Sequence, residues 1–310
     1  MPPTIVSSFS PDALASLSPR ALSDALERPA VVLFPESPVP LPSAEDLHFL
    51  REQMPRRLSR KNVSFYPSAG KLAGVEGDEA VAQRVRSLLE TRTRDVQAFL
   101  QRAMPEFTRG WTVGTSSFRP LEERGRDLKA HASNERVHVD AGAYGATHGA
   151  RVLRFFTNVN PTRDRVWTTK GDFAALFKRY GEEAGISAVR PLREGPLDKL
   201  RTGFLRTAER AGVPRASMAD SSPYDRVMRI FHNFMKDSSA FQEDPEGHEE
   251  MRFAPLVSWM VLTDGISHAC IEGQFAFVDT FLIPLANCRV KEAAPFHVLE
   301  GSTASTQARA

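Results

Sequence analysis

Three residues of the sequence have the types and the spacing of a metal site. His138 and Asp140 stand two positions apart in the short β-forming run ERVHVDA. Residues i and i+2 of a strand point to the same face, so an imidazole and a carboxylate would project side by side. Two histidines and one carboxylate that occupy one side of a metal form the site of non-haem Fe(II) oxygenases, which leaves positions open for other ligands.

The pair needs a second histidine from elsewhere in the chain. His268 lies in TDGISHACIEGQF, and among the histidines of the C-terminal half it alone is bracketed by two strongly strand-forming runs, 256–264 and 274–284. An H-x-D tripeptide and a turn histidine are both common in proteins without a metal. Taken by themselves, these residues therefore leave an ordinary polar role open beside the metal site.

The composition sets the class of protein. Of the 310 residues, 41% are hydrophobic and 25% are charged, as in globular proteins, which excludes a wholly disordered chain. Lys and Arg number 40 against 38 Asp and Glu, so the formal charge of +2 does not indicate a dedicated nucleic-acid binder. Two cysteines make no disulfide framework, the N-terminus lacks the regions of a secretory signal, and no apolar stretch reaches the roughly 20 residues of a membrane helix. We expect a cytoplasmic protein, with peripheral membrane contact left open.

The elements that position these residues follow from the hydrophobic pattern. The front of the chain is expected to be mostly helical, with its strongest amphipathic helix at about 78–104 and a stop at Pro105. Short strands punctuated by Gly and Pro favour a sandwich, a jelly roll or a barrel. The expected strands are 111–120, 135–141, 151–161, 251–255, 256–264 and 274–284, and the expected helical pieces between them are 173–180, 197–211 and 224–236.

We therefore predict a mainly β protein with substantial α content, built as a single domain over residues 1–300. Its parts would be a mostly helical front (1–110), a β core in two sections (111–168 and 250–296) and a helical insertion (169–249). The small polar tail, 301–310, is expected to be flexible.

Longer runs resemble the Kdo hydroxylase family over about residues 32–284, and the resemblance is strongest around the two segments with the candidate metal ligands. The runs are RVHVDA, RVLRFFTNVNP, SPYDRVM, HNFMK and TDGISHACIEGQFAFVDTFLIP. The resemblance implies a double-stranded β-helix, a jelly-roll core of the cupin kind, and a dioxygenase that uses Fe(II), 2-oxoglutarate and O₂. The implied reaction hydroxylates C3 of 3-deoxy-D-manno-oct-2-ulosonic acid (Kdo) in Kdo-lipid A, the inner core of lipopolysaccharide, and gives the sugar Ko.

The family's H-x-D…H triad falls on His138, Asp140 and His268. One run departs from the family, because AGAYGATHG follows Asp140 where an aromatic and Pro-containing loop is expected. This departure affects the expected substrate preference. Two alternatives remain: an oxygenase for another sugar or small metabolite, and a cupin-like sugar-binding protein without turnover.

The distal carboxylate of 2-oxoglutarate needs a cation, for which the planar fork of Arg is well suited. Arg154 follows Asp140 by 14 positions, on a predicted strand where it shares a face with Phe156 and Asn158. It is the preferred anchor, and a salt bridge at the barrel edge is its alternative. Arg289, 21 positions after His268, is too far along the chain.

Other polar residues are candidates for the cosubstrate and the sugar. Asn158 and Thr280 are assigned to 2-oxoglutarate, and Arg119, Asn160 and Lys236 to the anionic substrate. The two asparagines could equally close a turn before Pro161. The basic stretch 56–61 is interpreted as a membrane contact or as a solvated helix end.

Overall fold

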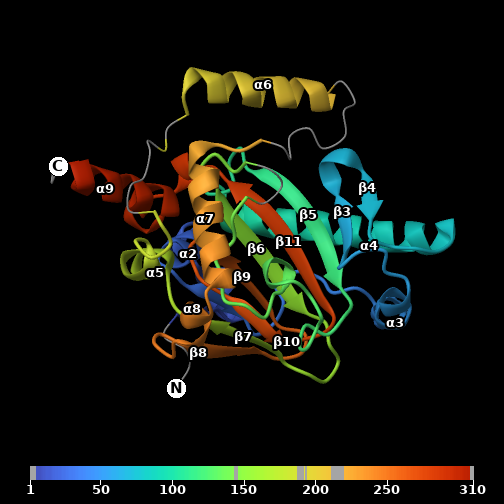
Figure 1. Ribbon diagram of the computed structural model, residues 1–310. Helices are drawn as coiled ribbons and strands as arrows, with labels where there is room; N and C mark the ends of the chain where they lie inside the picture. The colour runs from blue at the N-terminus through green and yellow to red at the C-terminus, as the bar shows by residue number, and fades with distance from the viewer. Residues whose placement is uncertain (1–4, 143–145, 187–191, 193, 211–219, 308–310) are drawn as a thin grey trace.

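The computed structural model describes residues 5–142, 146–186, 192, 194–210 and 220–307. Within that part of the chain the strands form two sheets, one of eight strands in the order β1-β2-β9-β6-β11-β5-β3-β4 and one of three in the order β10-β7-β8 (Figure 1). The large sheet contains β1 (Val6–Ser8), β2 (Val31–Phe34), β3 (Val63–Tyr66), β4 (Lys71–Ala73), β5 (Thr112–Arg119), β6 (Arg151–Asn158), β9 (Ser258–Leu262) and β11 (Ala276–Ile283), and the small sheet contains β7 (Arg165–Thr169), β8 (Glu249–Phe253) and β10 (Ala269–Glu272).

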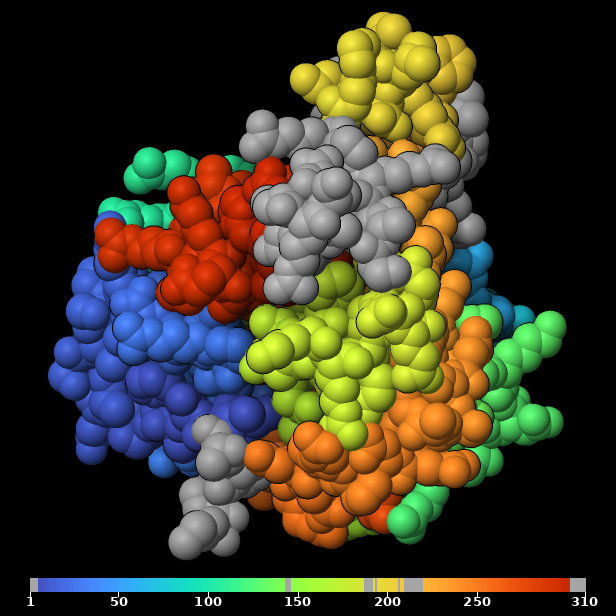
Figure 2. Space-filling view, turned by 60° about the vertical axis from the view of Figure 1, so that its left-hand side comes forward, coloured from blue at the N-terminus to red at the C-terminus, as the bar shows by residue number. Residues whose placement is uncertain are grey.

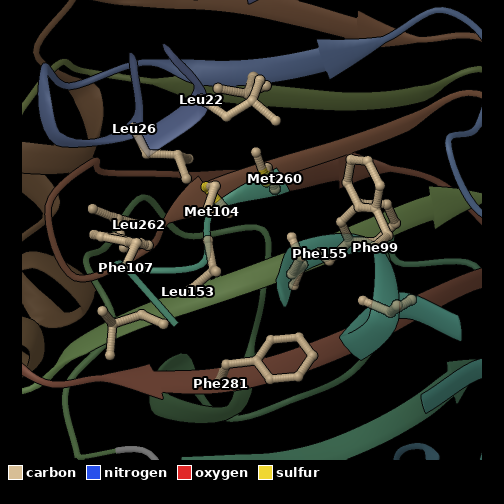
Figure 3. Close-up of a cluster of buried hydrophobic side chains, with 14 of the residues drawn as sticks. Leu22, Leu26, Phe99, Met104, Phe107, Leu153, Phe155, Met260, Leu262 and Phe281 are labelled. Atoms are coloured by element: carbon tan, nitrogen blue, oxygen red, sulfur yellow. The ribbon is translucent and has the colours of Figure 1, made fainter. Parts of the chain in front are cut away.

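Side chains of the central strands alternate between two apolar cores. Phe155 of β6 and Met260 of β9 face helices α2 (Ala21–Glu27) and α4 (Glu79–Ala103), in the cluster drawn in Figure 3. Their chain neighbours Phe156 and Trp259 point the other way and meet Trp167 of β7, in the core between the two sheets. This two-residue period matches the one that the sequence predicts, and the resulting sandwich is the jelly-roll core expected above.

The predicted helices 78–104, 173–180, 197–211 and 224–236 are present with nearly the same bounds. The side chain of Asp78 caps the start of α4 by accepting a hydrogen bond from the Val81 N–H at 2.8 Å. The three other predicted helices are α5 (Phe173–Tyr180), α6 (Pro196–Arg210) and α7 (Pro223–Asp237). The described part of the chain also contains α1 (Pro11–Ser16), α3 (Ala44–Gln53), α8 (Ser239–Glu243) and α9 (Pro295–Gln307). None of the described helices is long and apolar enough to cross a membrane.

Three expectations for the elements need correction. The front of the chain is not mostly helical, because it also supplies β1, β2, β3 and β4 at the two ends of the large sheet. These strands have three or four residues and are held by distant partners, β2 by β9 and β3 by β5, so local periodicity does not reveal them. The tail expected to be flexible is helical as far as Gln307, and 308–310 lie outside the described residues.

The third correction concerns 135–141, which was expected to be a strand. Of these residues only His138 pairs, through an isolated bridge to His268. The segment is instead held by α7, whose residues join an apolar cluster with Val137 and Val139. An extended backbone with few ladder hydrogen bonds still directs His138 and Asp140 to one side, because that alternation is a property of the extended conformation.

Candidate metal centre

One antiparallel bridge joins the two segments that carry the triad. The N–H of His138 donates to the carbonyl of His268 at 3.1 Å, and the N–H of His268 donates to the carbonyl of His138 at 2.8 Å. The N–H of Asp140 donates to the Thr263 carbonyl at 2.8 Å. One potential ligand atom from each of His138, Asp140 and His268 therefore lies within 4.8 Å of the others.

Backbone carbonyls orient both imidazoles. Nδ1 of His138 lies 2.7 Å from the carbonyl oxygen of Arg136, and Nδ1 of His268 lies 3.1 Å from that of Ile266. A carbonyl oxygen only accepts, so the proton of each ring is on Nδ1 and Nε2 keeps its lone pair. Metal-binding histidines are typically oriented by such a hydrogen bond from the second ring nitrogen. The three side chains fit a divalent metal.

The site also favours the protonation states that a metal requires. Burial lowers the pKa of His268 to about 4, and burial together with neighbouring His268 lowers the pKa of His138 well below its ordinary value. Burial alone would raise the pKa of Asp140. The guanidinium of Arg154, whose Nε lies 2.9 Å from Oδ2 of Asp140, and the two imidazoles instead hold that pKa well below its usual range. Two neutral imidazoles and an ionised carboxylate are metal-binding forms.

The triad lines a cavity of ≈ 220 Å³ that lies between the two sheets. Trp167 forms one aromatic wall and stacks on His268, with 5.2 Å between ring centroids. Cationic side chains dominate the remaining lining, and Asp140 is the one acidic group that the described residues contribute to it. The cavity is lined by Lys61, Arg119, His131, Ala132, Asn134, His138, Asp140, Arg154, Phe156, Trp167, His232, Lys236, His268 and Cys270.

Two lysines from distant parts of the chain hold one turn at the wall of this cavity. Nζ of Lys61 donates to the Ala132 carbonyl at 2.7 Å, and Nζ of Lys236 donates to the carbonyls of His131 and Ser133 at 3.1 and 2.9 Å. Burial lowers the pKa of each lysine to about 8. Both are cationic at neutral pH and lose their charge in mildly alkaline solution.

Arg119 of β5 is the fourth cation of the lining. Its Nη1 lies 3.6 Å from Oε1 of the buried Glu123, and burial lowers the pKa of Arg119 to about 10. Arg119 remains charged at physiological pH. Within the described part of the chain, Nε of Arg119 has no hydrogen-bond partner. The cavity therefore combines one carboxylate, the candidate metal ligand Asp140, with four cations, an arrangement suited to ligands that carry several negative charges.

The structure brings together six of the nine site residues predicted from the sequence and leaves three outside the cavity lining. Arg154, Arg119 and Lys236 line the cavity with the triad, and Arg154 shares its face of β6 with Phe156 as predicted. Asn158, Asn160 and Thr280 do not line it.

The amides of the two asparagines are used inside the protein. Nδ2 of Asn158 donates to the carbonyls of Arg163 and Phe253, and Oδ1 of Asn158 accepts from the Asn160 N–H. Oδ1 of Asn160 accepts from the N–H groups of Thr162 and Arg163. The asparagines therefore close the turn after β6, which was the alternative interpretation. Thr280 is buried on β11, where it is the register partner of Arg154 on the neighbouring strand β6.

His232 and Lys61 are two of the lining residues that the sequence analysis did not assign to the site. His232 of α7 lies with its Nδ1 2.6 Å from the Val139 carbonyl and with its ring centroid 5.1 Å from that of His138. Its spacing from Lys236, four positions along one helix, was the available signal, since residues i and i+4 share a helix face. Lys61 had no such signal, because it reaches the cavity through a contact with the distant Ala132. The sequence analysis had interpreted its stretch, 56–61, as a membrane contact or a solvated helix end.

Comparison with known proteins agrees with this geometry. The family described as 3-deoxy-D-manno-oct-2-ulosonic acid (Kdo) hydroxylase matches residues 12–306. The crystal structure of the Kdo hydroxylase KdoO with alphaketoglutarate and Fe(III), a non-heme Fe(II) alphaketoglutarate-dependent dioxygenase, is 26% identical with a TM-score of 0.78, over 97% of this chain and 96% of that one. The KdoO structure with cobalt(II) is 27% identical with a TM-score of 0.79, over 96% and 95%. A search of curated proteins finds no match.

Proposed function

Because the chain belongs to the Kdo hydroxylase family, whose members include the Fe(II)- and 2-oxoglutarate-dependent dioxygenase KdoO, we propose a specific reaction for it. The protein hydroxylates C3 of Kdo in Kdo-lipid A and gives Ko, with 2-oxoglutarate and O₂ as cosubstrates. A lipid-linked substrate would bring the protein to the cytoplasmic face of the inner membrane as a peripheral protein.

The observation that carries the proposal is the triad itself, with both Nδ1 atoms committed to backbone carbonyls and both Nε2 atoms left for a metal. His138, Asp140 and His268 would hold Fe(II). When bound, Fe(II) and 2-oxoglutarate supply the oxidation of a C–H bond, and the protein positions the sugar and limits access of water. A sugar-binding protein without turnover has no need of a three-ligand site with open positions, so the intact triad favours an enzyme.

The cations around the triad have separate tasks in this proposal. Arg154 anchors the distal carboxylate of 2-oxoglutarate, since it lines the cavity and its Nε reaches Asp140. Arg119, Lys61 and Lys236 face the anionic sugar, whose carboxylate needs a counter-charge where it leaves water for a partly buried cavity. His232 is a positioning residue, because its hydrogen bond to Val139 fixes the backbone between two of the ligands.

The test measures succinate release and the mass gain of one oxygen atom on Kdo-lipid A with purified protein, Fe(II) and 2-oxoglutarate. We expect both signals from the wild type and neither from His268→Ala, which also loses Fe(II) binding. His48→Ala, which changes an exposed histidine on α3, is the matched control and should behave as the wild type. Full turnover by His268→Ala would refute the metal assignment, and oxidation of a different sugar acid alone would refute the substrate.

A further inference from the structure

Helix α6 has its apolar face turned away from the protein. Leu197, Leu200 and Phe204 are 80%, 70% and 71% exposed, and they recur at positions i, i+3 and i+7, which places them on one face of the helix. In the space-filling view of Figure 2 the helix is the yellow projection at the top of the molecule. A surface helix normally buries such a stripe, so this orientation calls for a partner.

The opposite face of α6 is the one attached to the body of the protein. Thr202 lies on that face, is buried, and donates its hydroxyl hydrogen to Oδ1 of Asp220 at 3.0 Å. Thr202 and Lys199 also line a cavity of ≈ 700 Å³ that Tyr224 helps to enclose. The polar side of the helix is thus held toward the protein and the apolar side is held outward. The orientation is fixed by specific contacts.

The composition of α6 favours an anionic surface. The helix sequence contains four basic residues against two acidic ones, namely Lys199, Arg201, Arg206 and Arg210 against Asp198 and Glu209. The side chains of Lys199 and Arg201 are exposed, and Lys199 also lines the cavity on the side of the helix that faces the protein. Oδ1 of Asp198 lies 3.6 Å from Nη2 of Arg226 on α7, and Oδ2 of Asp198 accepts a hydrogen bond from the Gly195 N–H. The negative charge of Asp198 is therefore compensated within the protein. Exposed Leu and Phe beside Lys and Arg are typical of helices that lie in a lipid interface.

From these contacts we propose that α6 docks the protein on the surface of an anionic lipid bilayer, with Leu197, Leu200 and Phe204 inserted among the acyl chains. The choice of a bilayer as the partner rests on the proposed function, because Kdo-lipid A is held in a membrane. This surface is distinct from the basic stretch 56–61 of the sequence analysis. Phe65 near that stretch is buried, and Lys61 lines the cavity of the metal centre.

The experiment is co-sedimentation of the full chain with vesicles of phosphatidylethanolamine and phosphatidylglycerol, and with vesicles of phosphatidylcholine alone. We expect the wild type to bind the anionic vesicles, more weakly at high salt. The triple variant Leu197→Gln/Leu200→Gln/Phe204→Gln should lose about tenfold or more in affinity. Leu256→Gln, which changes an exposed leucine between β8 and β9, is the matched control and should bind as the wild type.

A second readout separates docking from chemistry. We expect the triple variant to oxidise a Kdo oligosaccharide without acyl chains as fast as the wild type does, and to lose rate on Kdo-lipid A embedded in vesicles. If the triple variant loses vesicle binding but the wild type turns over no Kdo substrate, the proposed function is refuted and the docking surface stands. Equal vesicle binding by the wild type and the triple variant would overturn the docking proposal. The docking proposal would also be overturned if the wild type does not bind vesicles and sedimentation velocity shows a dimeric wild type and a monomeric triple variant.

Discussion

Arg154 and Arg119 reach the same cavity from β6 and β5, which flank β11 on its two sides. We expect Arg154→Lys to raise the KM for 2-oxoglutarate about tenfold, because lysine keeps the charge and loses the bidentate geometry. Binding of Fe(II) should change little, and Arg119→Lys should raise the KM for the sugar instead. Steady-state kinetics with each substrate varied in turn checks both. A raised KM for 2-oxoglutarate in Arg119→Lys alone would move the anchor to β5.

Lys61 and Lys236 predict a pH dependence of substrate binding. Their pKa values, lowered by burial from 10.5 to about 8, mean that both are charged below about pH 8 and neutral above it. The KM for the anionic sugar should therefore rise as the pH increases from 7 to 9, with a smaller change in kcat.

The double variant Lys61→Met/Lys236→Met is the control for this pH dependence. Its KM should be roughly 10- to 100-fold higher at pH 7, since hydrogen bonds to charged groups contribute about 1.5–3 kcal/mol. Its KM should also change little between pH 7 and 9. If the KM of the double variant rises with pH as steeply as that of the wild type, the titrating groups are not these two lysines.

At the scale of elements, a buried ion pair attaches α4 to the large sheet. Nε of Arg92 lies 2.9 Å from Oδ2 of Asp279 on β11, and Nη2 of Arg92 donates to Thr157 of β6 at 2.9 Å. The hydroxyl of Ser116 on β5 donates to the other oxygen of Asp279 at 2.5 Å. The ion pair thus connects the helix with β11 and with the two strands beside it, β6 through Arg92 and β5 through Asp279, on the side of the sheet opposite to the cavity.

We expect Asp279→Ala to lower the free energy of unfolding by about 3–5 kcal/mol, because it leaves a buried guanidinium without its counter-charge. Burial lowers the pKa of Arg92 and raises that of Asp279, so both groups are costly to bury in their charged forms. The double variant Arg92→Met/Asp279→Leu should recover most of the loss. Urea unfolding measures all three proteins. A change below about 1 kcal/mol in Asp279→Ala would show that this pair does not hold the helix.

At the scale of the whole molecule, the metal would join two segments that lie 130 positions apart in the sequence. A ligand that binds only the folded state stabilises it by about 2.7 kcal/mol at 100 times its Kd. We therefore expect Co(II), the metal in one of the related structures, to raise Tm by several degrees, and EDTA to reverse the rise. Asp140→Ala should show no rise under the same conditions. An equal rise in that variant would place the metal elsewhere.

Local rules made part of this site predictable. The spacing of His138 and Asp140 was enough to put both on one side of an extended segment, and the alternation along β6 was enough to put Arg154 with Phe156. The helices at 78–104 and 224–236 followed from a 3.6-residue period. Resemblance to the family supplied the triad as a set and the cofactors, which spacing alone left open.

Tertiary structure decided what depends on pairing between distant residues. The bridge between His138 and His268, the approach of Lys61 to Ala132, and the pairing of β2 with β9 have no local pattern. The same limit explains α6. Its amphipathic period was visible in the sequence, but a period fixes only which residues share a face. The contact of Thr202 with Asp220 turns that face outward, because a helix is oriented by what it packs against.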